Sequence, residues 1–179
     1  MEKITFDKLL LKTAFCCLAC DGNLDIREIE LIKDIFSKNP LYSDSNFDEK
    51  LNSFIKKYNE KGKEFFAFYF DLLNEYDLSE QEELMIIDIA IKTIKADEEI
   101  QYAEIKFFKS IRSKLKVSDE LILNAYPDID NFLEKDILIE SSLSNITDKY
   151  FEIAELPKFE LISIDNNSLT ENNNNDQNN

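Results

Sequence analysis

The chain has 179 residues, of which 44 % are hydrophobic, and its formal net charge is −16 at neutral pH. This length and apolar content predict one domain with a real core, and the negative charge argues against binding to nucleic acid or to an anionic membrane surface. Two glycines and three prolines are too few turn-forming residues for a many-stranded sandwich or barrel, so we expect long helices.

Residue types that are missing or clustered limit the chemistry further. The chain contains no histidine, which is the commonest general base and metal ligand, and it has neither a glycine-rich phosphate loop nor a G-x-S-x-G motif. We therefore do not expect an enzyme. Cys16, Cys17 and Cys20 lie together in the first apolar segment. Such an odd, clustered set favours a reducing, cytoplasmic setting, and we expect these cysteines to fill the core.

The first two helices are separated by a short turn. Residues 3–20 are apolar on nearly all sides, which predicts a central helix rather than a signal peptide. A turn at 21–23 follows, and a capping-box pattern from Asp25 to Glu28 begins a second helix that ends at 38–40.

Helical signals continue through the middle of the chain. Periodic apolar residues predict five more helices, over 44–60, 63–76, 79–94, 101–115 and 118–126. We expect the aromatic side chains of residues 63–76 in the core, because an aromatic stripe at helical spacing usually packs inward.

After residue 126 the helical pattern weakens. Residues 135–140 and 158–165 look strand-like or extended, with a short helix expected near 147–156. The Asn-rich end of the chain cannot bury a core, which predicts a disordered tail. The predicted organisation is a helical domain, an extension and this tail, at residues 1–126, 127–165 and 166–179.

The helical region contains one pattern twice. When the sequence is laid over itself so that Asp21 falls on Asp97, Glu28 falls on Glu104. Apolar positions coincide in the same register, pairing Leu24 with Ile100, Ile29 with Ile105, Ile32 with Phe108 and Ile35 with Ile111. Because each helical hairpin needs the other to cover its apolar face, we predict an all-α fold of about seven helices in two halves related by a pseudo-twofold axis.

These repeated residues resemble the TerB-like family of tellurite resistance proteins, whose signature is an Ala-x-Asp-Gly hinge followed by Glu on the next helix, twice. The first copy here consists of Ala19, Asp21, Gly22 and Glu28. The second consists of Ala96, Asp97 and Glu104, and it departs from the family pattern because Glu98 stands where glycine is usual and the alanine is one place later.

The resemblance covers residues 3–124 and implies an all-α, non-catalytic interaction module. Its setting would be a bacterial stress-response system of the tellurite- or phage-resistance type, in the cytoplasm or peripheral to the inner membrane through partners. The implied partners are proteins, basic or membrane-associated. The sequence contains no uncharged stretch of the length that a membrane-spanning helix needs, so we expect no direct membrane insertion.

The two hinges also carry oxygen ligands at alternate positions. The candidate metal ligands are Asp21, Asn23, Asp25 and Glu28 in the first copy and Asp97 and Glu104 in the second. Calcium and similar divalent cations take several carboxylate and amide oxygens, although Ile26 and Ile32 stand where an EF-hand needs Gly and Glu. The alternative interpretation is that each Asp caps helix amides and each Glu suits the helix dipole.

Two alternatives to an interaction module tuned by a cation stay open. One is a divalent-cation-binding sensor that holds its ion at Asp21 and Glu28. The other is an acidic inhibitor that mimics nucleic acid, which the net charge of −16 suggests. The 21 basic residues that are mixed among the 37 acidic ones argue against such a mimic.

Overall fold

The fold is described by a computed structural model, which places residues 4–22, 24, 26–38, 46–96, 100, 102–133 and 156–162. Within these ranges the secondary structure is helical and includes no strand, which confirms the all-α prediction. The helices in chain order are α1 (Phe6–Ala19), α2 (Ile26–Ser37), α3 (Phe47–Lys61), α4 (Lys63–Glu75), α5 (Glu80–Ile94), α6 (Tyr102–Arg112), α7 (Asp119–Ala125) and α8 (Asp130–Leu133). No helix of this described part is long and apolar enough to cross a membrane.

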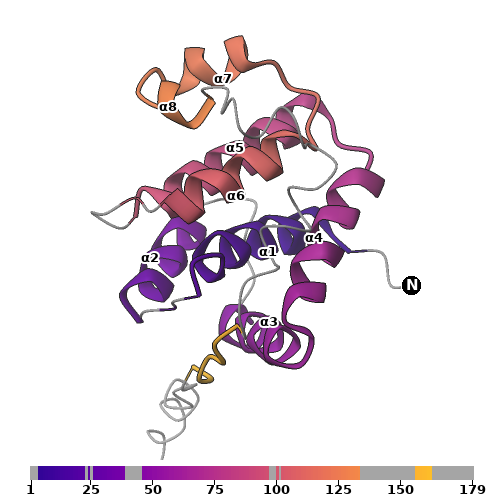
Figure 1. The fold of residues 1–179 in the computed structure, drawn as a ribbon, viewed down its shortest axis with the longest axis vertical. Coiled ribbons are helices and arrows are strands. Elements are labelled where there is room, and N and C mark those ends of the chain that lie inside the picture. Colours follow the sequence, from indigo (N-terminus) through magenta and orange to yellow (C-terminus); the bar gives the residue numbers. More distant parts are fainter. Residues whose placement is uncertain are drawn as a thin grey trace, which may run out of the picture.

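Helices α1 and α5 form the centre of the fold, and their packing against each other is the most extensive of any helix pair (Figure 1). The register that lays Asp21 on Asp97 also places α1 on α5 and α2 on α6. The helices pack reciprocally, α2 against α5 and α6 against α1. Ala14 and Ala90 occupy the same position of the repeat and are both fully buried, and small residues allow helices to pack closely. The described contacts thus follow the sequence repeat.

Helices α3 and α4 cover α1 with an aromatic layer. The Phe15 ring of α1 contacts the rings of Phe54 and Tyr58 on α3 and of Phe65 on α4, at centroid distances between 5.5 and 6.2 Å. Most aromatic side chains of α4 are buried, as expected, but Phe68 is 47 % exposed. Phe68 instead lines a cavity.

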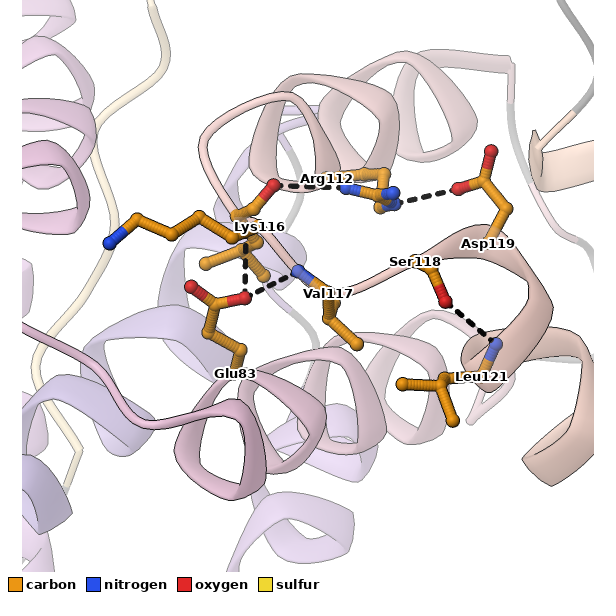
Figure 2. Close-up of polar contacts among 8 residues, drawn as sticks. Glu83, Arg112, Lys116, Val117, Ser118, Asp119 and Leu121 are labelled. Carbon is orange, nitrogen blue, oxygen red and sulfur yellow. Dashed lines mark hydrogen bonds and ion pairs between the residues drawn. The ribbon is translucent and has the colours of Figure 1, made fainter.

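The loop between α6 and α7 is fixed by a buried carboxylate (Figure 2). Glu83 of α5 is only 4 % exposed, and its Oε2 accepts hydrogen bonds from the backbone N–H groups of Lys116 and Val117, at 2.8 and 2.6 Å. Arg112 pairs with Asp119 at 2.8 Å next to this loop. Buried acceptors need donors, and here two backbone amides supply them.

Helical packing continues to residue 133. The side chains of Ile129 and Phe132 are buried, and the Phe132 ring meets Phe108 of α6 edge-on, at a centroid distance of 5.4 Å. The segments predicted at 135–140 and 147–156 lie outside the described residues, except for Leu156, as does the predicted tail at 166–179. Residues 158–162 are described and form no strand.

Candidate functional site

The described residues of the two predicted hinges lie at helix ends and in first turns. Asp21 is half-buried in the turn after α1, and Glu28 is half-buried in the first turn of α2. Glu104 is buried in the first turn of α6. Acidic residues in the first turn of a helix suit its dipole.

The pKa shifts of neighbouring groups indicate which helices lie close to Asp21 and Glu104. Burial raises the pKa of the Tyr58 phenol of α3 to about 12, and the charge of Asp21 contributes to this rise. Burial also raises the pKa of the Cys17 thiol of α1 well above its usual range, and Cys16 and Glu104 add to that shift. Asp21 therefore lies near α3, whereas Glu104 lies near α1.

The remaining predicted metal ligands Asn23, Asp25 and Asp97 lie outside the described residues. Within the described ranges, no group of three or more His, Cys, Asp or Glu residues is placed to hold a metal ion. The predicted divalent-cation site stays a prediction.

All three cysteines are buried and free of disulfides, in agreement with their expected place in the core. Burial raises the pKa of Cys16 to about 12. Since the thiolate is the nucleophile and the metal ligand, these thiols are poorly suited to chemistry in the folded protein.

A segment near the end of the chain, residues 156–162, lies along α3 (Figure 1, gold). Its half-buried side chains are Leu156, Phe159 and Ile162, and the residues between them are exposed. A buried residue at every third position is the period of a polyproline II helix, whereas a strand buries every second residue. Residues 156–162 therefore form an extended segment in which every third residue is half-buried, rather than the predicted strand.

Two asparagines of α3 hold the backbone of this segment. Asn59 donates from Nδ2 to the carbonyl oxygen of Phe159 at 2.8 Å and accepts at Oδ1 from the N–H of Phe159 at 2.9 Å. Asn52 makes the same pair of bonds to the backbone of Ile162, at 3.0 and 2.8 Å. Each amide side chain thus satisfies both the donor and the acceptor of one residue. We call Asn52 and Asn59 the asparagine clamp.

The spacing of the asparagine clamp matches that of the segment it holds. The two asparagines are seven positions apart on α3, which corresponds to about 10.5 Å along a helix. Phe159 and Ile162 are three positions apart, which corresponds to about 9–10 Å in an extended chain. The segment runs antiparallel to α3, since the earlier asparagine holds the later residue.

Side chains add selectivity to this backbone contact. The Phe159 ring stacks on Tyr58 at a centroid distance of 4.6 Å and an interplanar angle of 6°. At the other end, Pro157 Cγ lies 3.2 Å from where a Cβ on Gly22 would stand. Gly22 has φ +82°, so the glycine of the first hinge serves both the turn and the close approach of Pro157.

The asparagine clamp cannot be identified from the sequence alone. Asparagine on a helix is usually solvent-exposed, and a partner so far away along the chain leaves no local pattern. A usable signal was the pair of asparagines seven positions apart, combined with apolar residues at every third position of 156–162.

Comparison with protein-family models, curated proteins and solved structures finds no match for this chain. The TerB-like resemblance therefore depends on the repeated hinge residues.

Proposed function

We propose that the chain is a non-enzymatic, acidic interaction module that binds an extended peptide segment of a partner protein along α3. The observation that carries this proposal is the asparagine clamp, which pairs with both backbone groups of two residues of an extended chain. Residues 156–162 occupy the site as a ligand built into the same chain. A partner segment would replace them.

The chemistry of the site defines the partner segment. Backbone pairing accepts many sequences, whereas a pocket or a stacking partner selects side chains. The contacts of Phe159 and Pro157 favour a segment with an aromatic residue two positions after a proline. Apolar residues three positions before and three positions after the aromatic one would face the core, as Leu156 and Ile162 do.

The broader setting belongs to the same proposal. The TerB-like resemblance places such a module in a bacterial stress-response system of the tellurite- or phage-resistance type. Tuning by a divalent cation would act at Asp21 and Glu28. The contact between Gly22 and Pro157 connects that hinge to the peptide site.

A labelled peptide tests the proposal in the full-length chain. A fluorescent peptide with the sequence of residues 154–164 is titrated with wild type and with Phe159→Ala, whose built-in segment is weakened by the loss of its ring. We expect tighter binding to Phe159→Ala, measured by fluorescence anisotropy, because the peptide carries the intact Phe side chain.

The asparagine clamp supplies the specific control. Adding Asn52→Ala and Asn59→Ala to Phe159→Ala removes four hydrogen bonds. At about 0.5–1.5 kcal/mol each, their loss should weaken peptide binding at least tenfold. Adding Asn74→Ala instead, at an exposed position on α4, should change nothing. If the peptide binds the clamp-less protein equally well, or does not bind Phe159→Ala, the proposal is wrong.

A further inference from the structure

An open cavity of about 740 Å³ lies between the start of the chain, α1, α3 and α4. Its size falls within the range of small-molecule sites in proteins. The apolar part of its wall consists of Ile4, Phe54, Phe65, Phe68 and Leu72. The exposed side of Phe68, the exception among the aromatic residues of α4, belongs to this wall.

The polar part of the wall is strongly basic. Five lysines line the cavity, namely Lys8, Lys12, Lys50, Lys57 and Lys61. Among the described residues, the lining includes two carboxylates, Glu60 and Glu64. Lys61 pairs with Glu64 at 3.8 Å, and Lys50 pairs with Asp7 at 4.0 Å. The five lysines thus form a local positive cluster in a chain whose net charge is −16, and such a cluster attracts an anion.

Lys12 is the buried cation of the group. Its side chain is only 4 % exposed, and among the described residues no carboxylate pairs with it. Its Nζ lies 4.3 Å from the ring centroid of Phe68 and 4.6 Å from that of Phe65. A buried charge normally has a hydrogen-bonded ionic partner, and the aromatic rings supply only a partial substitute.

We propose that this cavity binds a long-chain carboxylate, with the carboxylate group on Lys12 and Lys57 and the hydrocarbon chain against Phe54, Phe65 and Phe68. The anionic headgroup would give the ammonium of Lys12 the partner that it lacks. The aromatic wall would take the apolar chain out of water.

Calorimetric titration of the full-length chain with octanoate, decanoate and dodecanoate tests the proposal. Each added CH₂ that is buried should tighten binding by up to about fourfold, so affinity should rise along the series. Dodecyltrimethylammonium, which has the same chain and the opposite charge, should bind at least tenfold more weakly than dodecanoate.

Variants locate the site. Lys12→Met keeps the apolar stem and removes the charge, and we expect it to weaken dodecanoate binding at least tenfold. Lys92→Met, at an exposed position on α5, is the matched control and should bind like wild type. Phe68→Ala should weaken binding and reduce the dependence on chain length.

Three results would overturn the proposal. The first is wild-type affinity for dodecanoate in a folded Lys12→Met protein. The second is equal affinity of wild type for the cationic amphiphile, which would indicate unspecific adsorption to apolar surface. The third is the absence of any binding of dodecanoate to wild type. Circular dichroism spectra of each variant confirm that a lost signal does not reflect unfolding.

Discussion

Replacing Lys12 with methionine is expected to stabilise the fold at neutral pH. Burial lowers the pKa of Lys12 from 10.5 to about 8, with Lys57 and Lys8 adding to the shift and Cys16 opposing it. A shift of this size corresponds to a loss of about 3 kcal/mol in the free energy of unfolding while the ammonium is charged. The two cation–π contacts offset about 1–2 kcal/mol of that loss. Methionine retains a flexible apolar stem, so we expect a net stabilisation of about 1–2 kcal/mol.

The stability difference between Lys12→Met and wild type depends on pH. Below pH 8 Lys12 is protonated in both the folded and the unfolded chain, so the destabilisation is fully present. Between about pH 8 and 10.5 the folded protein binds fewer protons than the unfolded chain, and the stability of wild type therefore rises relative to Lys12→Met. The advantage of the variant should therefore be much smaller at pH 10 than at pH 7, and it should vanish above about pH 10.5.

Urea unfolding, followed by circular dichroism at pH 7, 8.5 and 10, measures this difference. Lys92→Met serves again as the matched control, since its side chain is exposed. The cysteines, whose pKa values are raised by burial, destabilise every variant at high pH and largely cancel in the comparison. A Lys12→Met protein that is less stable than wild type at pH 7, or an advantage that is unchanged at pH 10, would refute the reasoning.

Three further outcomes follow from packing and hydrogen bonding. Gly22→Ala should lower the free energy of unfolding by about 1–2 kcal/mol, because φ is +82° and a Cβ would crowd Pro157. Adding Pro157→Ala should recover part of this loss, and purely additive effects of the two substitutions in urea unfolding would contradict the proposed cause. Glu83→Ala should cost about 2–3 kcal/mol in the same assay, since two amides lose a charged acceptor, whereas the exposed Glu80→Ala should change stability little. The three buried cysteines should react with a thiol reagent in urea far faster than in the native protein, and fast native labelling would contradict their burial.

Much of the fold could be predicted because its signals are local. The helical period of the apolar residues located α1 to α7, and the repeat that pairs Asp21 with Asp97 anticipated that α1 and α5 would be equivalent helices. Helix α8 was missed because its single turn is too short for a periodic pattern. The side chains of Ile129 and Phe132 are buried there. Because these two residues are only three positions apart, their spacing does not distinguish a helix from a short turn.

The candidate sites were less predictable because their partners are distant in sequence. Lys12 interrupts an apolar run, and a lysine in that position usually extends its ammonium to solvent. Its burial follows from the rings of Phe65 and Phe68 on α4, much later in the chain. Asn52 likewise depends on a backbone segment 110 positions away. Such pairings are set by tertiary packing, which the periodicity of one segment cannot show.

Because residues 156–162 belong to the same chain, a competing partner would need a minimum affinity to displace them. A segment carried on the same chain acts at an effective concentration on the order of millimolar, so a competitor with the same intrinsic affinity gains little occupancy at micromolar levels. Only a partner that binds more tightly, or that is itself concentrated locally by a second contact, would displace it. In the proposed function, the built-in segment would therefore exclude extended peptides that bind only weakly.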